Sequence, residues 1–295
     1  MRERQHIGLE CLEALTILLQ RVRSAHPTFG SFEAADFQWW WRTPRSTDSV
    51  PQLFWYDDTG QPSAAMIATA WRRATSLAPI VMPDATPDWT GHVIDRGLAH
   101  AASVGLDGVE MTVDGGDAFM IETLGAHGFE VVRPETVETW MDAVSRPGIS
   151  DLRPGYRLLS RPHTVGRPHH MTTRSGERVE ERLLQTSLYR PDLDLVVLDP
   201  EDRVAAFGLF WFDPVTETGL VEPMRTEDAH QRLGLARHVL TTGLDRLANA
   251  GASRIKIVYE PDNTPARRLY LSVGFRPVRE CVILAQRNRP DSGAG

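Results

Sequence analysis

The chain has 295 residues, 41% of them hydrophobic, and a formal net charge of −7. This length suits two domains, and the hydrophobic fraction supports folded cores. The negative charge argues against a nucleic-acid partner, which needs a basic face, and no apolar run reaches the length that spans a membrane.

The N-terminal segment predicts a helix of a soluble domain. It is rich in leucine, but Glu10, Glu13 and Gln20 interrupt it, so it indicates an amphipathic helix and not a signal peptide. The two cysteines, Cys11 and Cys281, are expected to be buried free thiols and not a disulfide, which predicts a reducing, cytoplasmic location.

Two features of the first half have structural interpretations. Trp39, Trp40 and Trp41 are expected to pack partly into a core and partly against a neighbouring domain, with the wall of a ligand pocket as the alternative. Residues 145–150 have the composition of a linker. We therefore place a domain boundary near residue 148, with one domain over 1–148 and a second over 149–295.

The next polar segment is expected to be exposed. His169 and His170 lack the spacing of a metal site, which predicts a solvated loop, and we expect no bound metal. Asp192 and Asp194 precede a strand over 195–198. We expect them to lie in solvent at the start of that strand, the alternative being that one of them faces an amine substrate.

The segment from Gln231 to Ala236 carries most of the functional information. It follows a predicted strand over 219–226 and opens an amphipathic helix that runs to about Ala250 and ends at Gly251. Gly234 lets the backbone approach a bulky anion, and the first helical turn offers unpaired N–H groups. Arg232 adds a charge that can reach a phosphate. The segment therefore predicts a pyrophosphate cradle.

A strand and a second helix follow. Residues 253–259 alternate like a strand, and a turn then leads into a helix with Thr264 as its N-cap and Pro265 as its first residue. We expect that helix to end at Gly274 and another strand to begin with Phe275.

At this point the chain resembles the GNAT superfamily of acyl-CoA-dependent N-acetyltransferases. The resemblance covers about residues 220–280 and rests on two motifs in the right order and at the right distance: Gln231-x-x-Gly234-x-Ala236, then Asn263-x-x-Ala266-x-x-x-Tyr270-x-x-x-Gly274-Phe275. Ala236 stands where glycine is commonest in the family, and alanine is an accepted variant.

The resemblance implies acetyl-CoA as co-substrate. The residues it assigns to the coenzyme are, for the pyrophosphate, Gln231, Arg232, Leu233, Gly234, Leu235 and Ala236, and for the pantetheine arm, Met224, Arg225, Thr226 and Asn263. The family also implies a carboxylate base on the strand before the cradle, which is Glu222 here, and places Tyr270 near the thiol.

These two side chains suit acyl transfer. An acceptor amine must lose a proton to attack, and Glu222 can take it; the alternative for Glu222 is a structural carboxylate at splayed strands. Pro223 cannot donate to a ladder, which predicts a bulge there. Tyr270 can protonate or hydrogen-bond the departing thiolate, and a backbone N–H near Met224 can polarise the thioester carbonyl.

The first half resembles a degenerate copy of the second. A shift of 146 residues carries Gly97 onto Gly243, Gly105 onto Gly251 and Gly128 onto Gly274 without a gap. The chemical positions do not survive, because Gly234 corresponds to Asp88 and Tyr270 to Leu124. The sequence thus predicts two tandem GNAT-like α/β domains, each a mixed, mostly antiparallel sheet flanked by helices. Mycothiol synthase has this type of architecture.

We therefore predict an N-acetyltransferase that moves an acetyl group from acetyl-CoA to a primary amine by direct attack in a ternary complex. The alternatives are a non-catalytic acyl-CoA-binding module, or acetylation of a thiol-sugar intermediate as in mycothiol synthase. The expected acceptor is a small-molecule or peptide amine, with no nucleic-acid or membrane partner, and the chain is expected to be a monomer or homodimer. Sequence alone does not choose the amine, the acyl chain length or whether the first domain retains coenzyme binding.

Overall fold

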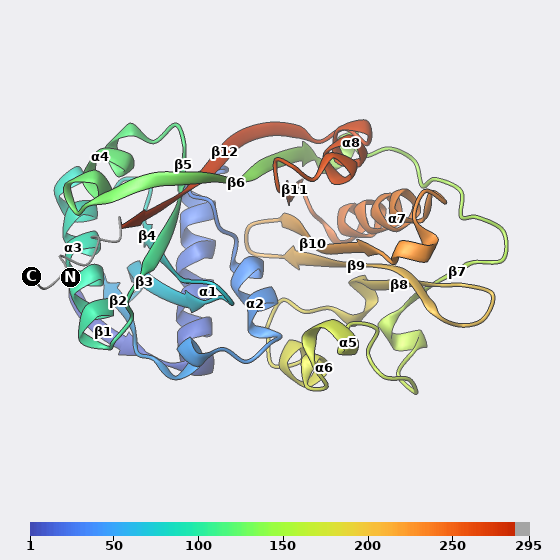
Figure 1. The fold of residues 1–295 in the computed structure, drawn as a ribbon, viewed down its shortest axis with the longest axis horizontal. Helices are drawn as coiled ribbons and strands as arrows, with labels where there is room; N and C mark the ends of the chain where they lie inside the picture. Colours follow the sequence, from blue (N-terminus) through green and yellow to red (C-terminus); the bar gives the residue numbers. More distant parts are fainter. Residues whose placement is uncertain (287–295) are drawn as a thin grey trace, which may run out of the picture. The chain divides into compact units, whose positions relative to one another are not determined.

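The computed structural model describes residues 1–286 of the chain, which forms two compact units (Figure 1). The first unit contains Met1–Ser31, Arg45–Val137 and the described residues from Arg279 to Gln286. The second contains Phe32–Pro44 and Glu138–Val278.

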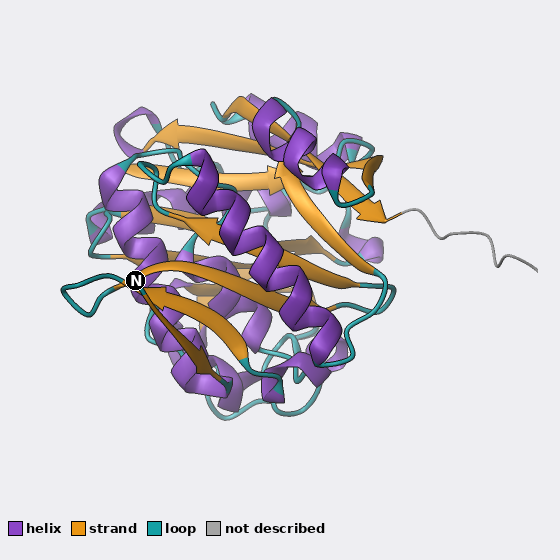
Figure 2. Ribbon diagram, turned by 90° about the vertical axis from the view of Figure 1, so that its left-hand side faces the viewer, coloured by secondary structure: helices purple, strands orange, loops and turns teal. Residues whose placement is uncertain are grey.

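The first unit is a mixed sheet with helices. Its elements are β1 (Arg2–His6), α1 (Gly8–Ala25), the 3₁₀ turn η1 (Ser46–Ser49), β2 (Gln52–Tyr56), β3 (Pro62–Ala70), β4 (Thr75–Val81), α3 (Pro87–Ser103), β5 (Val109–Asp114), α4 (Ala118–Ala126), most of β6 (Phe129–Asp142) and most of β12 (Arg276–Gln286). Strands β1 to β4 pair antiparallel, β4 and β5 pair in parallel, and β12 pairs antiparallel with β5. Figure 2, in which this unit faces the viewer, shows helices packed on its strands.

The second unit repeats this plan. Its elements are α2 (Ala34–Trp41), η2 (Ala143–Ser145), β7 (Arg157–Ser160), η3 (Arg161–His163), α5 (Thr172–Ser175), α6 (Val179–Leu183), η4 (Pro191–Leu193), β8 (Asp194–Leu198), β9 (Val204–Asp213), β10 (Thr218–Thr226), η5 (Asp228–His230), α7 (Leu235–Ala250), β11 (Arg254–Tyr259) and α8 (Thr264–Ser272). Strands β7 to β10 pair antiparallel, and β10 and β11 begin in parallel. Two tandem domains with mixed, mostly antiparallel sheets confirm the predicted fold class.

One long helix in each unit lies close against its sheet. In α7 the apolar residues at helical spacing, Leu235, Val239, Leu240, Leu244 and Leu247, are all 1% exposed or less. A Cβ on Gly243 would lie 2.0 Å from the ring of Phe210, and one on Gly97 of α3 would lie 2.4 Å from Met66. The repeated glycines at these two positions therefore have a packing reason, because any larger side chain would push the helix off the sheet.

The units do not divide the chain at a single point. The sequence predicted one boundary near residue 148, but helix α2, from the first half, lies in the second unit. There Gln38 is 1% exposed, donates from Nε2 to Ser187 Oγ at 2.9 Å and accepts from the N–H of Leu188 at 2.8 Å. Strand β12 leads back to the first unit, where it completes the pairing of β5. The linker-like residues 145–150 are instead internal to the second unit.

Other features of the first unit agree with the sequence. Helix α1 buries one face, which includes Cys11, and both cysteines are buried and form no disulfide. Within residues 1–286, no helix is both long enough and apolar enough to cross a lipid bilayer.

Candidate active site

The loop before α7 has the form of an anion cradle. Gly234 is the N-cap of the helix, with φ +82°, and Arg232 has φ +61°. No side chain caps the helix, so its first N–H groups keep their hydrogen-bonding capacity for a ligand. A Cβ on Gly234 would meet nothing within 4 Å, which leaves the space beside this backbone open.

The other predicted cradle residues contribute in different ways. Gln231 and Arg232 are exposed, and Gln231 donates from Nε2 to Asp228 Oδ1 at 3.2 Å. Leu233 and Ala236 are half-buried, whereas the side chain of Leu235 is 1% exposed and anchors the helix in the core. Leu235 can therefore offer a ligand only its backbone.

Strand β10 changes partners where the sequence predicted a bulge. Its parallel pairing with β11 covers Thr218–Leu220, and its pairing with β9 shifts register between Val221 and Met224. The indole N–H of Trp211 donates to the carbonyl of Glu222 at 2.8 Å and holds the irregular backbone in place. Beyond Leu220 the described residues show no pairing between β10 and β11, so this edge of β10 can receive an extended ligand.

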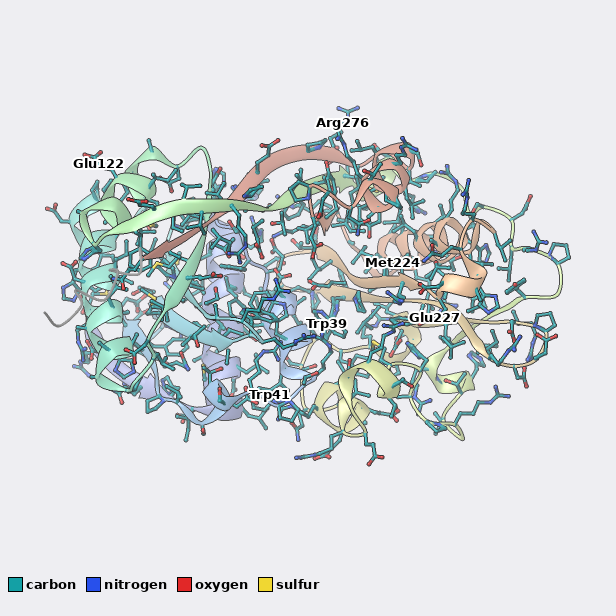
Figure 3. All side chains as sticks on the ribbon, in the orientation of Figure 1. Trp39, Trp41, Glu122, Met224, Glu227 and Arg276 are labelled. Atoms are coloured by element: carbon teal, nitrogen blue, oxygen red, sulfur yellow. The ribbon has the colours of Figure 1, made fainter. Side chains whose placement is uncertain are left out.

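The residues assigned to the pantetheine arm follow on β10. Met224, Arg225 and Thr226 pair with β9 on one side, and Met224 is labelled in Figure 3. The hydroxyl of Thr226 is buried and has no hydrogen-bond partner within the described chain. A buried hydroxyl without a partner costs free energy, so this atom fits a ligand that supplies one. The open cradle and this hydroxyl are both consistent with an acyl-CoA.

Glu222 is within electrostatic reach of a carboxyl group that the sequence did not predict, that of Asp36 on α2, and the indole of Trp39 also acts on its charge. Burial, and then the negative charge of Asp36, raises the pKa of Glu222 to about 8. Burial likewise raises the pKa of Asp36, to about 6, although Lys256 opposes it.

Tyr270 occupies the same electrostatic environment. It lies on α8, is 7% exposed, and has its ring 6.4 Å from those of Tyr259 and Phe275. Burial raises its pKa to about 12, and Glu222 is the second cause. The phenol is therefore a neutral hydrogen-bond donor near neutral pH. The structure thus brings the predicted base and the predicted acid within electrostatic reach of each other.

Asn263 has a structural role that the sequence assigned to its neighbour. It is the N-cap of α8, and its Oδ1 accepts the N–H of Ala266 at 3.2 Å. The predicted cap, Thr264, is instead the first helical residue, and Pro265 follows it. Asparagine is at least as good a cap as threonine. Because the two residues are adjacent, the observed N-cap differs from the predicted one by a single position. The amide nitrogen of Asn263 is not used in this cap.

The ammonium group of Lys256 is buried near Asp36. Lys256 on β11 is 1% exposed, and its Nζ lies 3.5 Å from Glu33 Oε1 and 3.7 Å from Glu138 Oε2. Its Nζ also lies 5.8 Å from the centre of the Trp140 ring. An ammonium is rarely buried without such partners. Lys256 therefore holds a positive charge near Asp36.

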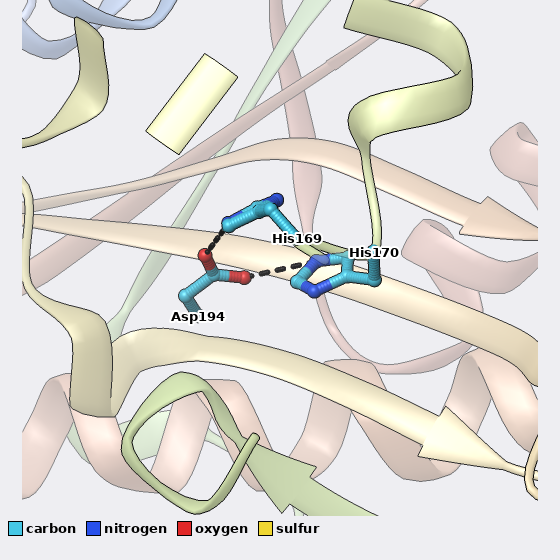
Figure 4. A group of neighbouring side chains, drawn as sticks. All are labelled: His169, His170 and Asp194. Atoms are coloured by element: carbon cyan, nitrogen blue, oxygen red, sulfur yellow. Dashed lines mark hydrogen bonds and ion pairs between the residues drawn. The ribbon is translucent and has the colours of Figure 1, made fainter. Parts of the chain in front are cut away.

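His169 and His170 do not lie in a solvated loop, and Asp194 is not exposed. The two rings stack 4.4 Å apart beside Asp194, which is 0% exposed (Figure 4). The hydroxyl of Tyr189 donates to the same carboxylate at 2.8 Å. His169 Nε2 lies 2.8 Å and His170 Nε2 3.0 Å from the oxygens of Asp194. The carboxylate lies 25 residues from His169 in sequence, too far for the local pattern to reveal.

This group also matches the residue types of a metal site, with ligand atoms within 4.8 Å of one another. The hydrogen bonds favour another interpretation. His169 Nδ1 accepts the N–H of Met171 at 3.2 Å, so Nε2 carries the proton that it donates to Asp194. A metal-binding histidine instead donates from its second ring nitrogen. We therefore interpret His169, Asp194 and Tyr189 as a structural hydrogen-bond network that fixes the start of β8, whereas the buried ring nitrogens of His170 have no hydrogen-bond partner within the described chain.

Asp36, Trp39 and Lys256 are the site residues that the sequence analysis missed. Asp36 and Trp39 lie on α2, and Trp39 is labelled in Figure 3. The guanidinium of Arg42 stacks 3.4 Å above the Trp39 ring and lowers the pKa of Glu222. The tryptophan run was the available signal, because a pocket wall was one of its two interpretations.

Sequence comparison identifies a domain in the second unit. Residues 154–275 match the acetyltransferase (GNAT) family, so the second unit contains a GNAT acetyltransferase domain. None of the curated proteins searched matches the chain.

Solved structures with a similar fold define the architecture. A tandem GNAT protein from the clavulanic acid biosynthesis pathway has 13% identity and a TM-score of 0.71, over 99% of this chain and 99% of that one. A GCN5-related N-acetyltransferase from Sphaerobacter thermophilus has 14% identity and a TM-score of 0.63, over 98% and 96%. At these identities the likeness concerns the fold, and the fold of this chain is that of a tandem GNAT protein.

Proposed function

We propose that the protein is an N-acetyltransferase that moves an acetyl group from acetyl-CoA to a primary amine, by direct attack in a ternary complex. The observation that carries this proposal is that Glu222 lies within electrostatic reach of Tyr270, in the unit that also holds an uncapped, glycine-led helix. The acceptor we propose is a small-molecule or peptide amine. The location we propose is the cytoplasm, where buried thiols that form no disulfide, such as those of Cys11 and Cys281, are usual.

Each residue has a defined part in this reaction. The carboxylate of Glu222 takes a proton from the amine, whose nitrogen then forms a bond to the thioester carbonyl carbon. Backbone N–H groups of β10 near Met224 stabilise the oxygen that becomes negative. As the carbon–sulfur bond breaks, the electron pair leaves with sulfur, and the hydroxyl of Tyr270 supplies a hydrogen bond or proton to that thiolate.

The test of this function is release of free thiol from acetyl-CoA across a panel of primary amines. For the best amine, Glu222→Gln lowers turnover by about 10²-fold or more near neutral pH, the span usual for acid–base groups. The loss is smaller at high pH, because an amine with a pKa of about 10 is then increasingly neutral without a base.

Glu217→Gln is the matched control for this variant. Glu217 is exposed in the turn that precedes β10, so the same change there leaves the rate unaltered. Tight binding of acetyl-CoA without thiol release from any amine would contradict the proposal and favour a non-catalytic acyl-CoA-binding module.

A further inference from the structure

Strand β9 holds the irregular part of β10 at two points. Between Val221 and Met224 the pairing of the two strands shifts register, so that Glu222 and Pro223 together lie opposite a single residue of β9. Such a bulge interrupts the regular ladder, and its backbone needs other contacts to keep one conformation. The position of Glu222, the proposed base, therefore depends on what holds this bulge.

The first anchor of the bulge is Trp211. Its indole N–H donates to the carbonyl oxygen of Glu222 at 2.8 Å, and its side chain is 0% exposed. Close packing keeps a buried indole in one orientation, so this hydrogen bond fixes the carbonyl oxygen at a defined place. The residue that is held in this way is the proposed base itself and not a neighbour.

The second anchor is Gly208, which pairs with Met224 where the ladder resumes. A Cβ on Gly208 would lie 2.6 Å from the sulfur of Met224 and 2.9 Å from Val239 of α7. The side chain of Met224 therefore lies where the side chain of a larger residue would be. Because side chains alternate along a strand, position 208 faces α7 and Trp211 faces away from it, so β9 holds the bulge from both faces.

The buried network at the start of β8 supports the first anchor. The ring centre of Trp211 lies 6.2 Å from that of Tyr189, whose hydroxyl donates to Asp194 at 2.8 Å. Asp194 is 0% exposed and also accepts from His169 at 2.8 Å. The carboxylate thus fixes the phenol, and the phenol pairs with the indole. A network with no part in the proposed reaction thereby supports the residue that holds the base.

We propose that Trp211 is a positioning residue for the acetyl transfer, which holds the backbone of Glu222 so that its carboxylate reaches the acceptor amine. This inference rests on the proposed function. A base acts only within hydrogen-bond reach of the proton that it takes, and a displacement of about 1 Å can cost about 10²-fold in rate. The buried indole touches no substrate and acts through Glu222.

The first test measures the anchor without any substrate. Trp211→Phe keeps an aromatic ring but removes the indole N–H, so amide hydrogen exchange in residues 222–226 of the full chain becomes faster by about 10-fold, the scale of one lost hydrogen bond. Trp55→Phe is the matched control, because Trp55 is 2% exposed in the core of the first unit. The same change there leaves exchange in residues 222–226 unaltered.

Gly208→Ala disturbs the bulge from its other face. The added methyl group must displace the side chain of Met224, so exchange in residues 222–226 becomes faster in this variant as well. It provides the same measurement if Trp211→Phe does not fold. Gly97→Ala is its control, because the methyl group added there meets a methionine of the first unit, Met66.

The second test compares turnover in two backgrounds with an active amine. In the unchanged protein Trp211→Phe lowers turnover by about 10- to 100-fold, the scale of a misplaced base. In Glu222→Gln the base is already absent, so adding Trp211→Phe causes no further loss. A general loosening of the fold would instead lower turnover by the same factor in both backgrounds.

The two tests separate the anchor from the reaction. Unchanged exchange in residues 222–226 of both Trp211→Phe and Gly208→Ala would overturn the anchor, whatever the activity. Faster exchange with the same loss of turnover in both backgrounds would overturn the positioning role and leave the proposed function in place. Faster exchange in a protein that acetylates no amine would overturn the proposed function, and the positioning role with it, while the anchor would stand as a structural contact.

Discussion

The starts of α3 and α7 show how one fold can keep or lose a ligand site. In the first unit Thr86 caps α3 and accepts the N–H of Trp89 at 3.2 Å, while Pro87 has no N–H and Asp88 puts a negative charge in the first turn. In the second unit Gly234 leads α7 with no capping side chain and no acidic residue in the first turn. At the start of α3 the chain itself supplies a hydrogen-bond acceptor for the N–H groups, whereas at the start of α7 the N–H groups remain available to an anion.

The second helices of the two units show the same contrast at one position. Helices α4 and α8 have the same length and are both capped by an Asx side chain, Asp117 in one and Asn263 in the other. Where α8 has Tyr270, α4 has Leu124, which is 0% exposed in the core. The scaffold is therefore retained in both units, and the chemical groups are retained in one.

The largest effect is expected at the start of α7. Gly234→Asp should abolish acetyl-CoA binding, because it adds bulk and negative charge where the pyrophosphate would approach the backbone. Calorimetric titration with acetyl-CoA measures this loss. Gly60→Asp is the control, since Gly60 has a similar φ of +78° and open space around it but lies in the first unit. If Gly234→Asp bound acetyl-CoA as tightly as the unchanged protein, the assignment of the pyrophosphate site to this loop would be wrong.

The next largest effect is expected at Tyr270. Tyr270→Phe keeps the ring but deletes the hydroxyl, and turnover should fall by about 10²–10⁴-fold if the phenol assists thiolate departure. Acetyl-CoA affinity should change little, because the hydroxyl acts mainly in the transition state. Tyr259→Phe, the same change in the neighbouring ring, is the control. If Tyr270→Phe left turnover unaltered, the hydroxyl would have no role in thiolate departure, and Tyr270 would be a packing residue only.

The number of bound acetyl-CoA molecules tests the comparison directly. Because α3 is capped and carries Asp88, we expect one molecule per chain and not two. Calorimetry or equilibrium dialysis with the full chain gives this ratio. Two comparable sites would show that the first unit binds the coenzyme by a surface other than the start of α3.

The smallest effects concern the two Asx caps. Asp117→Ala and Asn263→Ala each remove one capping bond and should lower the free energy of unfolding by about 1 kcal/mol. Denaturant unfolding measures this cost. Of the two, we expect Asn263→Ala alone to raise the KM for acetyl-CoA as well. A similar KM in both variants would assign Asn263 to the helix cap only.

Local sequence signals predicted the elements around the cradle well. The helical spacing of Leu240, Leu244 and Leu247 predicted α7, and Glu222-Pro223 predicted the bulge in β10, because helix period and proline chemistry act over a few residues. Repeated glycines revealed the tandem architecture, since a larger side chain at Gly97 or Gly243 would strike the sheet.

Contacts between distant segments were beyond these signals. Asp36 acts on the charge of Glu222, and His169 donates to Asp194, because the path of the whole chain brings them near, and no local period records such a pairing. The Trp39–Trp41 run showed that α2 is apolar but not which unit it joins. Strand β12 begins in the second unit and continues in the first. Because the strand is uninterrupted, its residue pattern does not reveal where one unit ends and the other begins.

The path of the chain also bears on how such a protein can evolve. Because Phe32–Pro44 lies in the second unit and the chain returns to the first at Arg279, neither unit corresponds to one uninterrupted stretch of coding sequence. A recombination event near residue 148 would separate Asp36 from Glu222 and would leave β5 without β12, exposing an unpaired strand edge. The two halves therefore depend on each other, because the second unit takes Phe32–Pro44 from the first half of the sequence and the first unit takes the strand that pairs with β5 from the second half.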